Sequence, residues 1–246
     1  LGYEKNRKIT LFFLFLTIIV TNVILLSGER ASFYHHLIFI LIVLPLFLLK
    51  NKAKIISVSV IFLFILVFTI FSNDYLKMRM YKNIKNSIND KVIFTVYHQE
   101  HFFSAYKIFL DNKFLGIGPK MFRHVCDEDR YRMTEEKFET QVYNCSTHPH
   151  NTYVQLLSET GIIGFSLIIC IFFIFFFQLM KCFYWHLIKG RKYIENYEIA
   201  IFSGFFVYLF PISPHGNFFN NWLNVFLALY VAFYLVTVLI KSKKNY

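Results

Sequence analysis

The sequence predicts an all-α, polytopic membrane protein with six transmembrane helices and a large external loop between the third and the fourth. Composition is the first reason: 56% of the 246 residues are hydrophobic and only 17% are charged, which is too apolar for a soluble domain of this length. The second is that the apolar residues form runs close to the roughly 20 residues that cross a bilayer as a helix. The third is that Lys and Arg cluster between these runs, as in proteins oriented by the positive-inside rule.

Six apolar runs account for the predicted transmembrane helices. They are Ile9–Ser27, Phe33–Leu49, Ile55–Ser72, Ile162–Tyr184, Ile199–Ser213 and Trp222–Ile240. Pro211 and Pro214 interrupt the fifth run, which a membrane helix tolerates where neighbouring helices or a cavity satisfy the freed backbone groups. The first run lacks a small-residue cleavage site and the chain starts with Leu1, so we expect neither a signal peptide nor a native start. We therefore expect this chain to be the C-terminal part of a longer protein.

Basic residues orient the predicted helices. If the six runs alternate, four basic clusters fall on one side, which is then cytoplasmic. The clusters are Lys5, Arg7 and Lys8; Lys50, Lys52 and Lys54; Lys181, Lys189, Arg191 and Lys192; and Lys241, Lys243 and Lys244. Much of the net charge of +11 lies in such clusters, which argues against nucleic acid as a partner. Three regions follow: residues 1–72 with three helices, the external loop 73–161, and residues 162–246 with three helices and a cytoplasmic tail.

The external loop is long enough to carry function rather than only a connection. Within it, Gln99–Leu110 has aromatic and apolar residues three and four apart, which predicts an amphipathic helix on the membrane surface or against the transmembrane helices. Cys126 and Cys145 both lie in this loop, and an oxidising compartment would let them form a disulfide worth about 3 kcal/mol. Two free thiols are the alternative that the sequence leaves open.

One stretch before the fourth run concentrates polar and ionisable residues: HPHNTYVQLLSETGIIG, residues 148–164. Pro149 favours an extended backbone at His148, so the two histidines on either side of the proline point the same way. Residues 152–155, Thr-Tyr-Val-Gln, have the form of a capping box. They predict a helix that starts near Thr152 and runs to about Glu159.

This helix places His150 and Asn151 at its N-terminus, where amide groups and the helix dipole favour an anion and disfavour a protonated imidazole. A neutral His150 beside an anion suits a general base that acts on a lipid-phosphate substrate. Gly161 suits the end of the helix, and Gly164 allows close packing against a neighbour. Two other interpretations stay open: a helix cap or surface histidine, and a metal site, although no third and fourth ligand stand at a suitable spacing.

The ordered motifs resemble those of the O-antigen ligase and polymerase family. His150-Asn151, nine residues and then Gly161-Ile-Ile-Gly164 resemble the family pattern His-Asn-x9-Gly-x-x-Gly. Leu26–Ser32 resembles the family's external turn with Ser and Arg, and Phe114–Pro119 with Phe122 resembles its Gly-x-Gly-Pro piece. The resemblance implies a membrane glycosyltransferase, metal-independent and inverting, in the bacterial inner membrane with its active site facing the periplasm.

The resemblance also implies a role for each candidate residue. His150 would activate the acceptor hydroxyl, and Arg30 would hold the diphosphate of the donor with the planar fork of its guanidinium. Arg79 is a second candidate for the diphosphate. The supporting residues are His148, Asn151, Gly161 and Gly164. The implied partners are an undecaprenyl-diphosphate-linked glycan, a lipid A-core or glycan acceptor, and membrane lipids, with no metal, cofactor or nucleic acid.

Three functions remain in competition at this level. A ligase moves the glycan to lipid A-core, and the histidine pattern leans slightly towards it. A polymerase moves the glycan to another lipid-linked repeat unit. A transporter or flippase of lipid-linked sugars would fit the interrupted fifth run and the membrane arginines, but the runs show no internal repeat and the polar residues gather on one side. A structural membrane fragment without activity is a further possibility.

Overall fold

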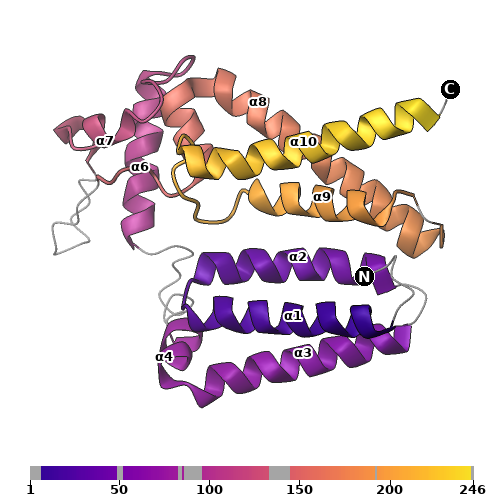
Figure 1. Cartoon of the computed structure of the whole chain (residues 1–246). Helices are drawn as coiled ribbons and strands as arrows, with labels where there is room; N and C mark the ends of the chain where they lie inside the picture. The colour runs from indigo at the N-terminus through magenta and orange to yellow at the C-terminus, as the bar shows by residue number, and fades with distance from the viewer. Residues whose placement is uncertain are drawn as a thin grey trace. The chain divides into compact units, whose positions relative to one another are not determined.

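The computed structural model describes residues 7–48, 52–82, 85, 96–132, 145–191 and 193–244. Within these ranges the chain is helical and contains no strand (Figure 1), which confirms the all-α prediction. The chain divides into two units. Unit 1 comprises residues 1–89, 175–208 and 234–246, and unit 2 comprises residues 90–174 and 209–233.

Unit 1 is built on three long apolar helices, α1 (Arg7–Leu26), α2 (Arg30–Leu48) and α3 (Lys52–Ser72). Apolar side chains along their length favour helices that satisfy their own backbone groups in lipid. The three helices pack together, and α9 (Asn196–Tyr208) packs against α2 (Figure 1). A cluster of buried apolar residues closes one end of the bundle; it consists of Leu25, Phe33, Leu66, Leu76 and Met80.

The chain bends sharply where α3 ends. Asn73 caps the short helix α4 (Asp74–Leu76), because its Oδ1 accepts the N–H of Leu76 at 3.1 Å. The π-helical segment η1 (Lys77–Lys82) follows. The helical stretch 74–82 is bent by 97° relative to the helical stretch 60–72. This bend carries the basic residues of η1 back towards the α1–α2 turn.

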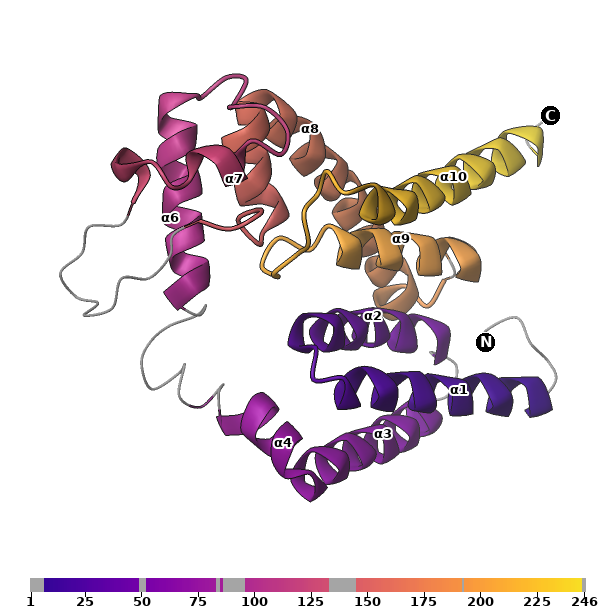
Figure 2. The same cartoon turned by 60° about the vertical axis from the view of Figure 1, so that its left-hand side comes forward.

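Unit 2 contains α6 (Val96–Asp111), α7 (Phe122–Val125), η2 (Asp129–Tyr131), residues 152–174 of α8 (Thr152–Phe183) and residues 221–233 of α10 (Asn221–Lys244). The segment η3 (Tyr184–Ile188) continues α8 in unit 1. In unit 2, α6, α7 and the first turns of α8 lie side by side (Figure 2). Their shared core contains Ala105, Ile108, Phe122, Cys126 and Tyr131.

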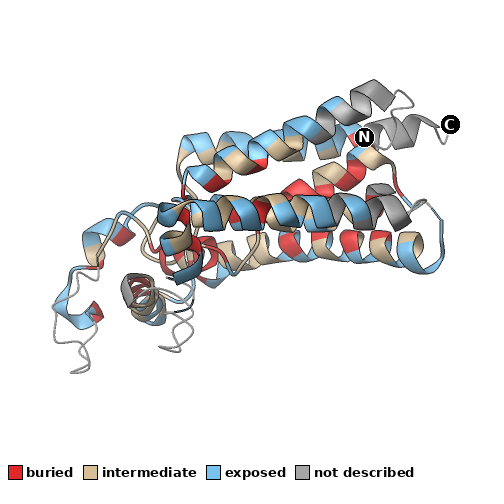
Figure 3. Cartoon of the chain, turned by 90° about the horizontal axis from the view of Figure 1, so that it is seen from below, coloured by how far each residue is buried: buried red, intermediate tan, exposed pale blue. Residues whose placement is uncertain are grey.

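Each of the six predicted apolar runs forms a helix: α1, α2, α3, α8, α9 and α10. Six transmembrane helices are nevertheless not confirmed. In the described part of the chain one helix, Thr152–Ile188, is long and apolar enough to cross a membrane, and the bent pair 60–72 and 74–82 is a second candidate. Large apolar side chains are exposed along the long helices, and Figure 3 shows exposed positions recurring over their length. Of the orienting basic residues, Lys5, Lys50 and Lys192 lie outside the described residues.

The helix predicted over Gln99–Leu110 is confirmed as part of α6, but the aromatic side is not the most buried one. The buried residues of α6 are Glu100, His101, Ser104, Ala105 and Ile108, whereas Tyr106 and Leu110 are exposed. Phe102, Phe103 and Phe109 of the apolar stripe are half-buried, and the placement of this helix at a membrane surface stays a prediction. The side of the helix that is buried in unit 2 carries both polar residues, among them Glu100, His101 and Ser104, and the apolar Ala105 and Ile108.

Candidate functional site

Four imidazole rings gather in unit 2. We call them the histidine cluster: His98 and His101 on α6, and His148 and His150 in the segment before α8. The ring centroid of His150 lies 4.3 Å from that of His148, 5.3 Å from that of His98 and 5.4 Å from that of His101. His101 is buried and the other three are half-buried. The fold thus brings the two predicted histidines against a pair from another helix.

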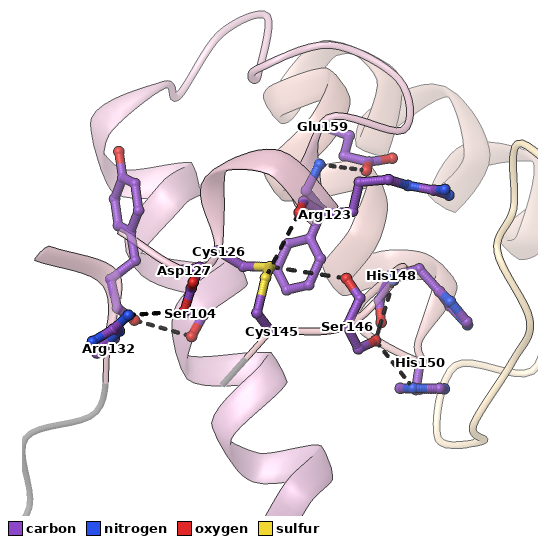
Figure 4. The surroundings of a disulfide bond; sticks show 12 residues. Ser104, Arg123, Cys126, Asp127, Arg132, Cys145, Ser146, His148, His150 and Glu159 are labelled. Atoms are coloured by element: carbon purple, nitrogen blue, oxygen red, sulfur yellow. Dashed lines mark hydrogen bonds and ion pairs between the residues drawn. A yellow bond between two sulfur atoms is a disulfide. The ribbon is translucent and has the colours of Figure 1, made fainter. Parts of the chain in front are cut away.

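The segment 145–151 is fixed at both ends. At its start, Cys145 forms a disulfide with Cys126 (Figure 4). The sequence had left open whether these two cysteines pair or stay free thiols. At its end, the Oδ1 of Asn151 accepts the N–H of Tyr153 at 3.0 Å, so that Asn151 is the N-cap of α8. The Nδ2 of Asn151 donates to the carbonyl of Pro211 at 2.8 Å, which ties the same segment to residues 209–220.

The helix α8 begins at Thr152, as predicted. The capping box predicted from Thr152 and Gln155 is wrong, because the side chain of Gln155 does not bond back to the helix N-terminus. Asn151 supplies the cap one residue earlier, and Gln155 is engaged elsewhere. The Nε2 of Gln155 donates to Glu159 and to Asn217, each at 2.9 Å, and its Oε1 accepts the N–H of Phe218 at 2.9 Å. This buried network fastens α8 to the 209–220 segment instead of closing the helix end.

His150 has a left-handed backbone, with φ 59°. Such a conformation costs a residue other than glycine about 1–3 kcal/mol, and histidine is among the residues that tolerate it best. The carbonyl of His150 accepts the N–H of His215 at 2.8 Å, and Asn151 is anchored immediately after it. These contacts hold the imidazole of His150 at the bend that precedes α8.

Ser146 determines which nitrogen of His150 carries the proton. Its Oγ lies 2.7 Å from the carbonyl of His148 and 3.3 Å from Nε2 of His150 (Figure 4). A carbonyl only accepts, so the single hydroxyl proton of Ser146 goes to His148. Nε2 of His150 must then donate to Ser146, which leaves the lone pair of a neutral ring on Nδ1.

Hydrogen bonds engage both nitrogens of His148. Its Nε2 lies 3.1 Å from the carbonyl of His215 and must donate to it. Its Nδ1 lies 3.0 Å from the hydroxyl of Thr147, which donates to Nδ1 when the ring is neutral. Both nitrogens of His148 are thereby occupied, so it supports the site and does not exchange protons with a substrate in this arrangement.

Burial favours the uncharged form of three members of the cluster. Desolvation, followed by repulsion from His150, His98 and His148, lowers the pKa of His101 from 6.5 to about 4. Desolvation and the neighbouring His150 lower the pKa of His148 to about 4, and the guanidinium of Arg123 adds to this shift against the opposing bond to the His215 carbonyl. Desolvation also lowers the pKa of His150. A neutral His150 can therefore accept a proton.

A break in α8 lies one turn beyond the capping network. Gly161 has φ 62° and ψ −164°, and helix continues on both sides of it, so Gly161 interrupts the helix instead of ending it. The loop 113–118 fills the break: Ile117 donates to the carbonyl of Ser158 at 3.0 Å and Gly118 to that of Glu159 at 2.9 Å. A side chain on Gly161 would meet the backbone of Phe114.

The side chain closest to Gly164 comes from the preceding turn of its own helix. A Cβ at this position would meet the side chain of Thr160, whose hydroxyl donates to the carbonyl of Leu156 at 2.7 Å. Close packing of Gly164 against a neighbouring helix stays a prediction. Gly164 thus allows α8 to resume directly after Gly161.

The two predicted arginines share one corner of unit 1. Arg30 is the first residue of α2, and the Nε–H of Arg79 in η1 donates to the carbonyl of Gly28 in the preceding turn. The sharp bend after α3 makes this contact possible. Both arginines are half-buried, and the Nε–H of Arg79 is engaged by the carbonyl of Gly28.

Within the described residues, no group of three or more His, Cys, Asp and Glu side chains has the geometry of a metal site.

A family model decides which proteins this chain is related to. The model described as O-antigen ligase matches residues 13–169, well over half of the chain. The chain belongs to the O-antigen ligase family. Its members are integral membrane enzymes of the ligase and polymerase type. No curated protein and no solved structure matches the chain.

The match confirms the resemblance drawn from the histidine and glycine motifs, and it includes both the arginine corner and the histidine cluster. Three residues of the candidate site were not found from the sequence. Two are His98 and His101, whose spacing of three on a predicted helix was the available signal. The third is Ser146, whose role depends on a bend that no local pattern predicts.

Proposed function

We propose that this protein transfers a glycan from undecaprenyl diphosphate to an acceptor hydroxyl, as an O-antigen ligase does to lipid A-core, with Nδ1 of His150 as the general base. The observation that carries the proposal is the environment of His150. Its ring is neutral because of burial, its Nε2 donates to Ser146, and the remaining lone pair is therefore on Nδ1. A base with these properties is what an unactivated sugar hydroxyl needs.

The proposed step is a single displacement. Nδ1 of His150 takes the proton of the acceptor hydroxyl while the acceptor oxygen forms a bond to the anomeric carbon. The bond from that carbon to the diphosphate oxygen breaks, and its electron pair leaves with undecaprenyl diphosphate. One displacement inverts the anomeric configuration, and the imidazolium then returns its proton to water.

Arg30 and Arg79 are proposed to bind the diphosphate. Charge on the leaving oxygen grows as the bond breaks, and guanidinium groups stabilise it with paired hydrogen bonds. The Gly28 contact orients Arg79 for this task. Within unit 2, Arg123 is exposed and its charge reaches His148, so we add it as a candidate contact for an anionic substrate.

The proposed location follows from the predicted topology. Residues 73–161 would lie in the periplasm between two groups of three helices, in the bacterial inner membrane. A disulfide in this region supports the assignment, because disulfides persist in the periplasm and are rare in the cytosol.

The test replaces His150 by Asn in the complete protein, reconstituted in liposomes with a labelled undecaprenyl-diphosphate glycan. Asparagine tolerates the left-handed backbone at this position better than alanine. We expect transfer to fall by about 10²–10⁴-fold. The matched control is His124→Asn, an exposed histidine of the same unit, which should transfer normally. Near-normal transfer by H150N would remove His150 from the chemistry.

Two acceptors in the same assay separate the reactions within the family. Transfer to lipid A-core identifies a ligase, and transfer to a second lipid-linked glycan identifies a polymerase. Movement of the labelled donor across the bilayer without any new linkage would instead identify a transporter and would overturn the proposal.

A further inference from the structure

The loop that fills the break in α8 carries an unusual pair of side chains at its tip. Phe114 and Leu115 are 73% and 74% exposed, the highest values among the large apolar side chains that the structure describes. Exposing such a side chain to water forfeits about 1.5–3 kcal/mol relative to burying it. Two neighbours with this exposure indicate a surface that is covered in the working protein.

The position of the loop identifies what covers it. The N–H of Ile162 donates to the carbonyl of Lys113 at 2.8 Å, so the tip lies beside the first residues after Gly161. From Ile162 onward α8 is apolar, and Ile163 and Leu167 are 52% and 64% exposed. Among the helices that the structure describes, α8 with its continuation to Ile188 is long and apolar enough to cross a membrane. The exposed surface of the loop is therefore continuous with a surface that faces lipid.

The charges around the tip fit a membrane interface. Lys113 and Lys120 flank the apolar tip and are both exposed, and no acidic residue lies between them. Lysines near an interface bind anionic headgroups and extend their charged ends towards water. A protein partner would not explain why the apolar tip adjoins the start of a lipid-facing helix.

We propose that Phe114 and Leu115 insert into the boundary between headgroups and acyl chains of the bilayer. Backbone hydrogen bonds join residues 113–118 to residues 158–163. These bonds hold the tip of the loop against α8. The loop then fixes the height of the α8 N-terminus, and with it the histidine cluster, relative to the membrane surface. The proposal is independent of the transfer chemistry.

The experiment places a tryptophan at the tip of the full-length protein. Phe114→Trp is prepared in a background with Trp185→Phe and Trp222→Phe, which removes the native indoles. The protein is reconstituted in vesicles of phosphatidylethanolamine and phosphatidylglycerol, with or without bromine on the acyl chains near the headgroup. Leu115→Trp serves as a second probe, and Glu128→Trp, at an exposed acidic position of the same unit, is the matched control.

We expect brominated lipid to quench the emission of F114W and L115W several-fold more than that of E128W. Retention of the Cys126–Cys145 disulfide on a non-reducing gel shows that each variant has folded. Water-like emission of both tip probes without quenching would overturn the proposal. A blue-shifted emission that is unquenched and depends on protein concentration would also overturn it, because a second protein copy would then cover the loop.

Discussion

The hydroxyl of Ser146 lies 3.3 Å from Nε2 of His150, on a segment that begins at the Cys126–Cys145 disulfide. The same hydroxyl bonds the carbonyl of His148 at 2.7 Å. One short side chain thus fixes the bend of the segment and selects the tautomer of the proposed base. A serine four residues before the histidine has no signature in the sequence, so its role follows from the fold alone.

Replacing Ser146 by Ala should lower kcat more than it raises KM. Without the hydroxyl, the two neutral tautomers of His150 become closer in energy and the ring is less well oriented. A hydrogen bond of this kind contributes about 1 kcal/mol, which corresponds to roughly a several-fold to tenfold loss in rate. Steady-state transfer kinetics over a range of pH would show the loss as a reduced plateau.

The matched control for Ser146 is Ser158→Ala. Ser158 is buried in the same unit, but its hydroxyl bonds only carbonyls of its own helix, at 3.1 and 3.2 Å. The control should keep kcat. Equal losses in both variants would mean that Ser146 acts through stability and not through His150.

Arg30→Ala should weaken use of the donor. A hydrogen bond to a charged group is worth about 1.5–3 kcal/mol, so kcat/KM for the lipid-linked glycan should fall by about 10–100-fold. Arg79→Lys should cause a comparable loss, because lysine cannot keep both the Gly28 contact and a planar fork. Titration of the donor at saturating acceptor measures both effects.

Arg191→Ala provides the control for these arginines, since Arg191 is an exposed residue of unit 1 in a basic cluster. It removes the same charge without changing the proposed diphosphate contacts. If R191A lost as much activity as R30A, general charge rather than specific binding would be responsible.

The histidine cluster should make the protein sensitive to acid. The pKa of His101 is about 4 in the folded protein and 6.5 when unperturbed. The unfolded chain therefore binds more protons between these values, and stability falls as the pH drops from 6.5 towards 4. The slope from one such histidine is about 1.4 kcal/mol per pH unit. Above pH 6.5 this contribution to stability is complete.

Thermal unfolding in detergent at several pH values checks this effect. His101→Phe removes one of the titrating groups, so its melting temperature should fall less between pH 6.5 and 4 than that of the wild-type protein. His124→Phe, at an exposed histidine, should leave the pH dependence unchanged. A wild-type protein with no loss of stability in this range would contradict a buried neutral cluster.

The positions of the helices and of the family motif could be predicted from the sequence. Apolar runs and the spacing of His150, Gly161 and Gly164 are local properties of the chain. The interior of unit 2 was not. The aromatic stripe of Gln99–Leu110 predicted a helix correctly, but the residues buried in the cluster lie on its polar side. A polar side chain is buried only when partners from other segments satisfy it, and such partners are not visible in a local pattern.

Competition between neighbouring caps explains another difference. Thr152 and Gln155 match a capping box, but Asn151 is an equally good cap and lies one residue earlier. Gln155 then finds its partners in Glu159 and Asn217, of which the latter is far along the chain. The sequence predicted a helix start near Thr152, where α8 begins, whereas tertiary contacts decided the partner of each side chain.

The backbone contact between the loop 113–118 and the break in α8 should depend on the absence of a side chain at Gly161. Gly161→Ala adds a Cβ that meets the backbone of Phe114, in a conformation with φ 62°. Gly190 also has a positive φ, of 61°, but nothing lies within 4 Å of its Cβ position. G190A therefore measures backbone strain alone, about 1–2 kcal/mol, and G161A should cost about 1–3 kcal/mol more because rigid backbone must move. Melting temperatures of the two variants give the comparison, and an equal loss would show that the loop is not held against α8.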